Sequence, residues 1–154
     1  MNSVEQKETL IMRVALQSDL PDVLELYAQL GQDDGSILDM SEATRIFNIM
    51  KTYPDYRVYL AVLNEKAVGT FTLLIMDNIA HKGAKSAVLE DVVVSETMRG
   101  KGVGTLMMDY AGKLAKQKGC YKLSFSSNRN RTDAHRFYEK LGFERHGISF
   151  LIEL

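Results

Sequence analysis

The chain contains no tryptophan, two prolines and a single cysteine, Cys120, in 154 residues. A lone cysteine excludes an internal disulfide framework, and with three histidines it offers no spacing typical of a zinc site. No apolar run reaches the ~18–20 residues that span a bilayer, and the polar N-terminus lacks the apolar centre of a signal peptide. We therefore expect a cytoplasmic protein with no metal and no membrane partner.

An excess of charge of one sign is also absent, because 19 basic and 20 acidic residues leave a formal net charge of −1. This balance gives no indication of a nucleic-acid partner. The length fits one domain, and 45% hydrophobic residues are enough for a substantial core. We expect a single domain over residues 1–154, in which residues 1–8 fray before the first strand.

Hydrophobic periodicity predicts elements in the order β-α-α-β-β-β-α-β-α-β. The predicted helices run from a cap at Ser18 to Gly31 and over 43–50, 102–118 and 134–141. The predicted strands cover 10–15, 57–63, 67–75, 86–94 and 121–125, and 143–154 alternates like one or two further strands. Residues 86–125 form one βαβ unit, whose crossover should be right-handed and parallel. The class is α+β (mixed α/β), with a single central mixed, mostly antiparallel sheet and helices on both faces.

A glycine-rich segment, Arg99-Gly100-Lys101-Gly102-Val103-Gly104, stands between the strand at 86–94 and the helix that follows it. The first N–H groups of a helix have no partner within it, and the helix dipole adds partial positive charge there. Glycines let successive N–H groups approach a phosphate, and Arg99 and Lys101 add charge beside them. The dinucleotide fingerprint G-x-G-x-x-G and the P-loop G-x-x-x-x-G-K-[ST] both fail. The segment predicts a pyrophosphate site; the alternative is a turn that only caps the helix.

The pattern R-x-x-G-x-G after a valine-rich strand resembles the acyl-CoA pyrophosphate loop of the GNAT superfamily of N-acetyltransferases. Two further stretches are similar to motifs of that family: the central strand at 89–94, and A-x-x-F-Y-x-x-x-G-F at 134–143. The resemblance implies the GNAT fold and acetyl-CoA as co-substrate. It also implies that the cofactor contacts residues of these motifs: Val92, Val93, Val94, Arg99, Gly100, Lys101, Gly102, Val103, Gly104, Thr105, Ala134, Phe137 and Tyr138.

One position departs from the family pattern. Many members carry a CoA-contacting asparagine three residues before the alanine of the second motif, and here that position is Arg131. Asn128 and Asn130 stand nearby and are the alternatives for this contact.

Acetyl transfer to an amine requires a base for the amine, donors for the thioester oxygen and a proton for the departing thiolate. Glu90 is the first candidate for the base, Asp91 is the second, and a water relay is an alternative to direct contact. Strand alternation places these carboxylates on opposite faces unless a bulge intervenes, and either is alternatively structural or solvated. Backbone N–H groups near Val92 are the candidate oxyanion donors. The resemblance places Tyr138 near the CoA sulfur as a general acid; its alternative role is a core aromatic.

These residues predict an N-acetyltransferase that acts on a primary amine. The leading interpretation is that this amine belongs to a small molecule. The alternatives are a protein or peptide N-acetyltransferase and a non-catalytic acyl-CoA-binding sensor. The loop with Asp33, Asp34, Asp39 and Glu42 offers an acidic rim for a cationic acceptor, although an ordinary surface loop has the same composition. A homodimer that pairs through residues 148–154 is a further expectation.

Overall fold

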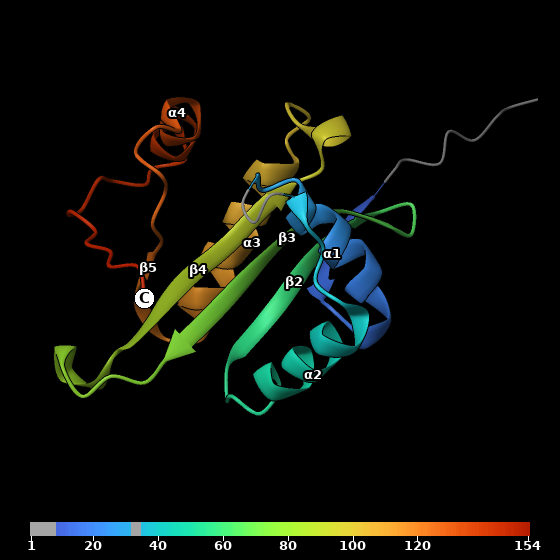
Figure 1. Ribbon diagram of the computed structural model, residues 1–154. Helices are drawn as coiled ribbons and strands as arrows, with labels where there is room; N and C mark the ends of the chain where they lie inside the picture. The colour runs from blue at the N-terminus through green and yellow to red at the C-terminus, as the bar shows by residue number, and fades with distance from the viewer. Residues whose placement is uncertain (1–8, 32–34) are drawn as a thin grey trace, which may run out of the picture.

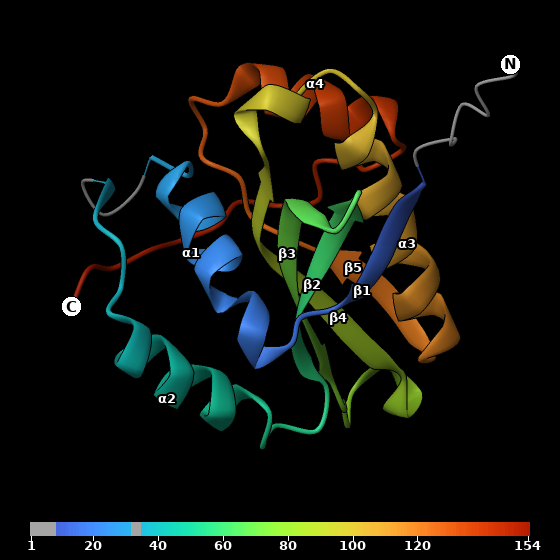
Figure 2. The ribbon, with the colours of Figure 1, turned by 90° about the vertical axis from the view of Figure 1, so that its right-hand side faces the viewer.

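The computed structural model describes residues 9–31 and 35–154, so the expected fraying of residues 1–8 lies outside the described chain. One five-stranded sheet, in the order β1-β2-β3-β4-β5, carries helices on both of its faces (Figures 1 and 2). The strands are β1 Leu10–Val14, β2 Tyr56–Leu63, β3 Lys66–Met76, β4 Lys85–Val94 and β5 Cys120–Ser124. The helices are α1 Leu20–Ala28, α2 Met40–Met50, α3 Val103–Gln117 and α4 Thr132–Lys140.

Strand pairing in the sheet is antiparallel from β1 to β4 and parallel between β4 and β5. Strands β2 and β3 form a hairpin whose turn residues Asn64 and Glu65 have φ of 48° and 64°, the left-handed conformation of a tight hairpin turn. Helix α3 connects the parallel pair, which is the predicted βαβ unit. The mixed, mostly antiparallel sheet expected from the sequence is confirmed.

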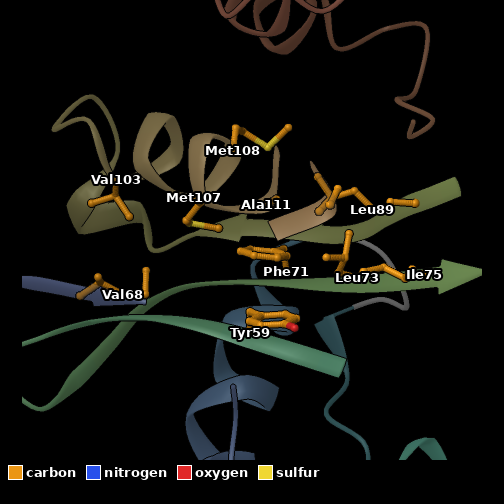
Figure 3. Close-up of a cluster of buried hydrophobic side chains, with 13 residues drawn as sticks. Tyr59, Val68, Phe71, Leu73, Ile75, Leu89, Val103, Met107, Met108 and Ala111 are labelled. Carbon is orange, nitrogen blue, oxygen red and sulfur yellow. The ribbon is translucent and has the colours of Figure 1, made fainter. Parts of the chain in front are cut away.

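Two hydrophobic cores lie on opposite faces of this sheet. Helices α1 and α2 pack on one face, over a cluster that includes Val58, Leu60 and Val93. Helix α3 packs on the other face over Phe71, whose ring stacks on Tyr59 with centroids 5.2 Å apart (Figure 3). The sheet is thus covered by hydrophobic packing on both sides.

Two glycines test the packing of α3 against the sheet. A Cβ atom added at Gly69 on β3 would lie 2.5 Å from Sδ of the fully buried Met107 and 3.1 Å from the carbonyl oxygen of Val93. We expect Gly69→Ala to lower the free energy of unfolding by about 1–3 kcal/mol because the core is overpacked. The control is Gly112→Ala, inside α3, where the added Cβ meets nothing within 4 Å. It should raise the free energy of unfolding by about 0.5–1 kcal/mol. Urea unfolding measures both, and equal effects at the two sites would contradict this account.

Several predicted boundaries move. Ser18 does not cap a helix, because it lies inside a single 3-10 turn, Gln17–Asp19, and α1 begins at Leu20 and ends at Ala28 rather than near Gly31. Helix α2 begins at Met40, earlier than predicted, because the Asp39 carboxylate accepts hydrogen bonds from the N–H groups of Ser41 and Glu42.

The predicted strands at 143–154 are wrong. This segment leaves α4 without secondary structure (Figure 1), and Ile148, Phe150 and Leu151 each expose more than 80% of their surface. Alternating polarity makes a strand only where a neighbouring strand supplies hydrogen bonds, and a single copy of the chain pairs no strand with this segment.

No helix among residues 9–31 and 35–154 is long and apolar enough to cross a membrane. The cytoplasmic location stays a prediction.

Candidate active site

Strand β4 contains a bulge at the point where the sequence places the two candidate carboxylates. Thr72 on β3 pairs with Glu90, and Thr70 pairs with Val93, so Asp91 and Val92 together stand opposite Phe71. Asp91 has φ of 51°, a left-handed conformation that aspartate and asparagine tolerate better than other non-glycine residues. The bulge interrupts strand alternation and turns Asp91 toward the face covered by α1 and α2.

From Leu89 onward, and so through the bulge, β4 pairs with no described strand on its β5 side. The parallel ladder runs only from Lys85 with Cys120 to Val88 with Ser124, while β4 continues to Val94. Val93 is buried in the core beneath α1 and α2, whereas Val92 and Val94 pack on the α3 side. Backbone groups of this stretch that point away from β3 are therefore not used in a β4–β5 ladder, and the oxyanion role of the groups near Val92 stays a prediction.

The glycine segment follows this unpaired stretch and leads directly into α3. Gly100 and Gly102 have φ of 74° and 84°, and no atom lies within 4 Å of a Cβ added at either position. Gly102 is the N-cap of α3 and no side chain caps the helix, so the first N–H groups of the helix are exposed to a ligand. Arg99 and Lys101 stand beside these N–H groups, and both side chains are exposed. The Arg99 Nη1 atom lies 3.9 Å from Oε1 of Glu96. This uncapped helix start fits the diphosphate of a CoA.

Helix α4 lies against the start of α3 (Figure 2). A Cβ atom added at Gly104 would be 3.2 Å from Cζ of Phe137, which shows how closely the two helices approach. The Tyr138 ring packs edge-on against Phe125 with centroids 4.5 Å apart, and Phe125 directly follows β5. Burial raises the pKa of Tyr138, while Arg131 opposes the shift. Tyr138 therefore stays protonated at neutral pH, and its ring lies beside the C-terminal end of β5.

The two asparagines proposed as substitutes for the family asparagine lie in the turn before α4. The Asn128 side chain accepts a hydrogen bond from the backbone N–H of Asn130 at 2.9 Å, and the Asn128 carbonyl accepts one from the N–H of Arg131 at 3.0 Å. Asn128 thus shapes the turn before α4. Ala134, in the first turn of α4, is half-buried. Which asparagine contacts the cofactor stays a prediction.

A cavity of 390 Å³ opens between α1, α2 and the sheet. Asp91 lies in its wall together with Tyr27 of α1 and Thr72 of β3, and the Tyr27 and Thr72 hydroxyls are 3.2 Å apart. Burial raises the pKa of Tyr27 to about 12, and the negative charge of Asp91 adds to the shift. Tyr27 was not among the site residues predicted from the sequence, because its helical spacing is that of a core residue. The one signal was a hydroxyl on an otherwise aliphatic helix face.

The two candidate carboxylates differ in position. Asp91 lines the cavity, and Glu90 is not among the lining residues. Burial raises the pKa of Asp91. Burial also raises the pKa of Glu90, and the negative charge of Asp91 adds a smaller effect in the same direction. Both carboxylates therefore hold protons more readily than free carboxylates do, which is useful for groups that must accept one.

The expected acidic rim is in part structural. Asp39 caps α2, and Glu42 accepts hydrogen bonds from the Arg45 guanidinium, with Nε to Oε2 at 2.8 Å. Asp33 and Asp34 lie outside the described residues. Within the described ranges, no group of three or more histidine, cysteine, aspartate or glutamate side chains is placed to hold a metal ion.

Comparison with known proteins shows the family. The model described as "Acetyltransferase (GNAT) family" matches residues 20–143. Glucosamine 6-phosphate N-acetyltransferase of Trypanosoma brucei brucei is 31% identical over 151 residues, covering 93% of this chain and 95% of the relative. A solved structure from Agrobacterium tumefaciens is 35% identical with a TM-score of 0.88, over 94% of this chain and 99% of the other. Glucosamine-6-phosphate N-acetyltransferase of Arabidopsis thaliana is 27% identical with a TM-score of 0.83, over 95% and 99%. The chain therefore belongs to the GNAT family of N-acetyltransferases, and acetyl-CoA is its acyl donor.

Proposed function

We propose that this enzyme acetylates the primary amine of a small molecule in the cavity beside β4. The observation that carries the proposal is the position of Asp91. This residue lines the 390 Å³ cavity, and it stands in the bulge within the stretch of β4 that has no partner on its β5 side. Cavities of ~300–1,000 Å³ are typical of small-molecule sites, and the site has a carboxylate where the amine and the thioester must meet.

In the proposed mechanism the amine attacks directly, without an acyl-enzyme. Acetyl-CoA supplies the thioester carbonyl, so that a C–N bond forms and the C–S bond breaks. Asp91 takes the proton that the amine nitrogen loses, and backbone N–H groups near Val92 donate to the carbonyl oxygen. Tyr138 gives its hydroxyl proton to the departing sulfur. A catalytic role of Glu90, the first candidate from the sequence, stays a prediction.

An acceptor panel tests this proposal. Thiol release from acetyl-CoA is measured with amino sugars, polyamines, amino acids, alkylamines and peptides of mixed sequence. We expect turnover with at least one small amine and none with the peptides, because the cavity is bounded by two helices and the sheet. Turnover with peptides alone would identify a peptide N-acetyltransferase. Tight binding of acetyl-CoA without turnover of any amine would identify a sensor.

We also propose that two copies of the chain pair through residues 148–154, whose apolar side chains are exposed in a single copy. Light scattering should give the mass of a dimer for the whole chain. A variant without residues 148–154 should give the mass of a monomer while its circular dichroism spectrum is retained. A monomeric whole chain at micromolar concentration would contradict the proposal.

A further inference from the structure

The wall of the cavity is predominantly apolar. Helix α1 contributes aliphatic side chains and Tyr27, and α2 contributes Ile46 and Phe47. Ile37 and Leu38 join them from the segment before α2. Among the described residues that line the cavity, Asp91 is the one charged side chain, and none is lysine, arginine or histidine.

The cations near α2 are engaged elsewhere. The Arg57 guanidinium donates to the carbonyl oxygens of Tyr53 at 2.9 Å and Tyr56 at 2.8 Å. Arg45 pairs with Glu42, and Lys51 Nζ lies 5.2 Å from the centroid of the Phe47 ring. A phosphate group in the cavity would therefore lose its hydration without gaining a cation from the described lining residues, which is strongly unfavourable.

The polar groups of the cavity include Thr72 and Asp91 on the sheet and Tyr27 on α1. Thr72 is 2% exposed and its hydroxyl lies 3.2 Å from that of Tyr27, while the Asp91 carboxylate is close enough to raise the pKa of Tyr27. The Asp91 carboxylate and the Tyr27 and Thr72 hydroxyls thus offer acceptors to the three donors of an ammonium. At the rim, Ile37, Leu38 and Ile46 are 58%, 46% and 36% exposed. An occupant therefore meets an anion at Asp91 and mainly hydrocarbon along the rest of the wall.

We infer that the acceptor is a primary amine on an apolar body, aliphatic or aromatic, rather than a phosphorylated amino sugar. The ammonium binds at Asp91, Tyr27 and Thr72, and the apolar body packs between α1 and α2 against Ile46 and Phe47. This inference rests on the proposed function and names its substrate class. It also separates this chain from relatives whose names specify glucosamine 6-phosphate.

A homologous series of amines tests the inference. We expect kcat/KM to rise at least ~10-fold from propylamine to pentylamine, because one methylene in an apolar pocket contributes ~10–200-fold. Phenethylamine should resemble pentylamine, and glucosamine 6-phosphate should be the poorest acceptor. A preference for glucosamine 6-phosphate, or no dependence on chain length, would overturn the inference and leave the acetyltransferase proposal standing.

A matched pair of variants on α2 locates the apolar body. Ile46→Lys adds an ammonium at the rim and should lower kcat/KM for pentylamine ~10–100-fold, with the KM for acetyl-CoA unchanged. Ile49→Lys is the control, because Ile49 is 44% exposed on the same helix and does not line the cavity. Equal activity of the two variants would overturn the inference. A loss of dimer mass in Ile46→Lys alone would also overturn it, because it would show that a second copy of the chain covers this face.

Calorimetry separates this inference from the proposed function. Phenethylamine titrated into the protein with CoA present should bind to the wild type and to Ile49→Lys, and at least ~10-fold more weakly to Ile46→Lys. Binding without turnover would refute the transferase proposal and support the amine site. Turnover of polar amines, with no phenethylamine binding, would refute the amine site alone.

Discussion

Replacing Asp91 with asparagine should lower kcat/KM for the amine by ~10²–10⁴-fold, the usual contribution of a general base. The substitution removes the proton acceptor from the cavity wall and keeps the shape of the side chain. Asparagine also tolerates the φ of 51° found at this position, so the bulge in β4 should survive. Steady-state thiol release at saturating acetyl-CoA measures the effect, and the KM for acetyl-CoA should stay near its wild-type value.

Glu90→Gln is the matched control for this variant, because Glu90 is the adjacent carboxylate and does not line the cavity. We expect a loss of less than ~10-fold. A larger loss in Glu90→Gln than in Asp91→Asn would return the catalytic role to Glu90, the first candidate from the sequence.

The proposed role of Asp91 also predicts how kcat/KM depends on pH, and the same two variants test it. A carboxylate must be ionised to accept a proton, so kcat/KM should fall as pH decreases through the pKa of Asp91. Burial raises that pKa, so the acid limb should lie above the ~3.9 of a free aspartate. The limb should disappear in Asp91→Asn and persist in Glu90→Gln. A limb that persists in Asp91→Asn would show that another group takes the proton.

Replacing Tyr138 with phenylalanine should lower kcat by ~10²–10⁴-fold. Phenylalanine retains the ring that packs 4.5 Å from Phe125 and loses the hydroxyl proton offered to the departing sulfur. The pKa of Tyr138 is raised by burial, so the wild-type hydroxyl stays protonated through neutral pH and the loss should be the same from pH 6 to 8. Thiol release under saturating conditions measures kcat, and urea unfolding checks that stability is unchanged.

Tyr121→Phe serves as the control, since Tyr121 is 43% exposed and its ring stacks on His81 away from α4. Its kcat should equal that of the wild type. Wild-type kcat in Tyr138→Phe would mean that solvent protonates the thiolate and that Tyr138 is a core aromatic.

Much of the fold could be predicted because its signals are local. The helical spacing from Val103 onward, the strand before it and the glycines between them all depend on residues close in sequence. The left-handed φ of Gly100 and Gly102 is a property that glycine supplies by itself. The loop, helix α3 and the parallel strand after it were therefore accessible from the sequence.

The acceptor side could not be predicted, because it depends on partners distant in sequence. The bulge at Asp91 is defined by the register of β4 against Thr70 and Thr72 on β3, which no local pattern records. Tyr27 has the spacing of a core residue, and it lines a cavity only because α1, α2 and the sheet come together around it. Residues 143–154 alternate like a strand, yet a strand requires a partner that a single copy does not supply.

The central claim is that the uncapped start of α3 holds the diphosphate of acetyl-CoA while the unpaired stretch of β4 aligns its thioester beside Asp91. A crystal structure of the acetyl-CoA complex tests it most directly. The account predicts phosphate oxygens within hydrogen-bond distance of the N–H groups of Val103, Gly104 and Thr105, and the thioester beside Val92. A diphosphate bound elsewhere, or a thioester remote from Asp91, would contradict it.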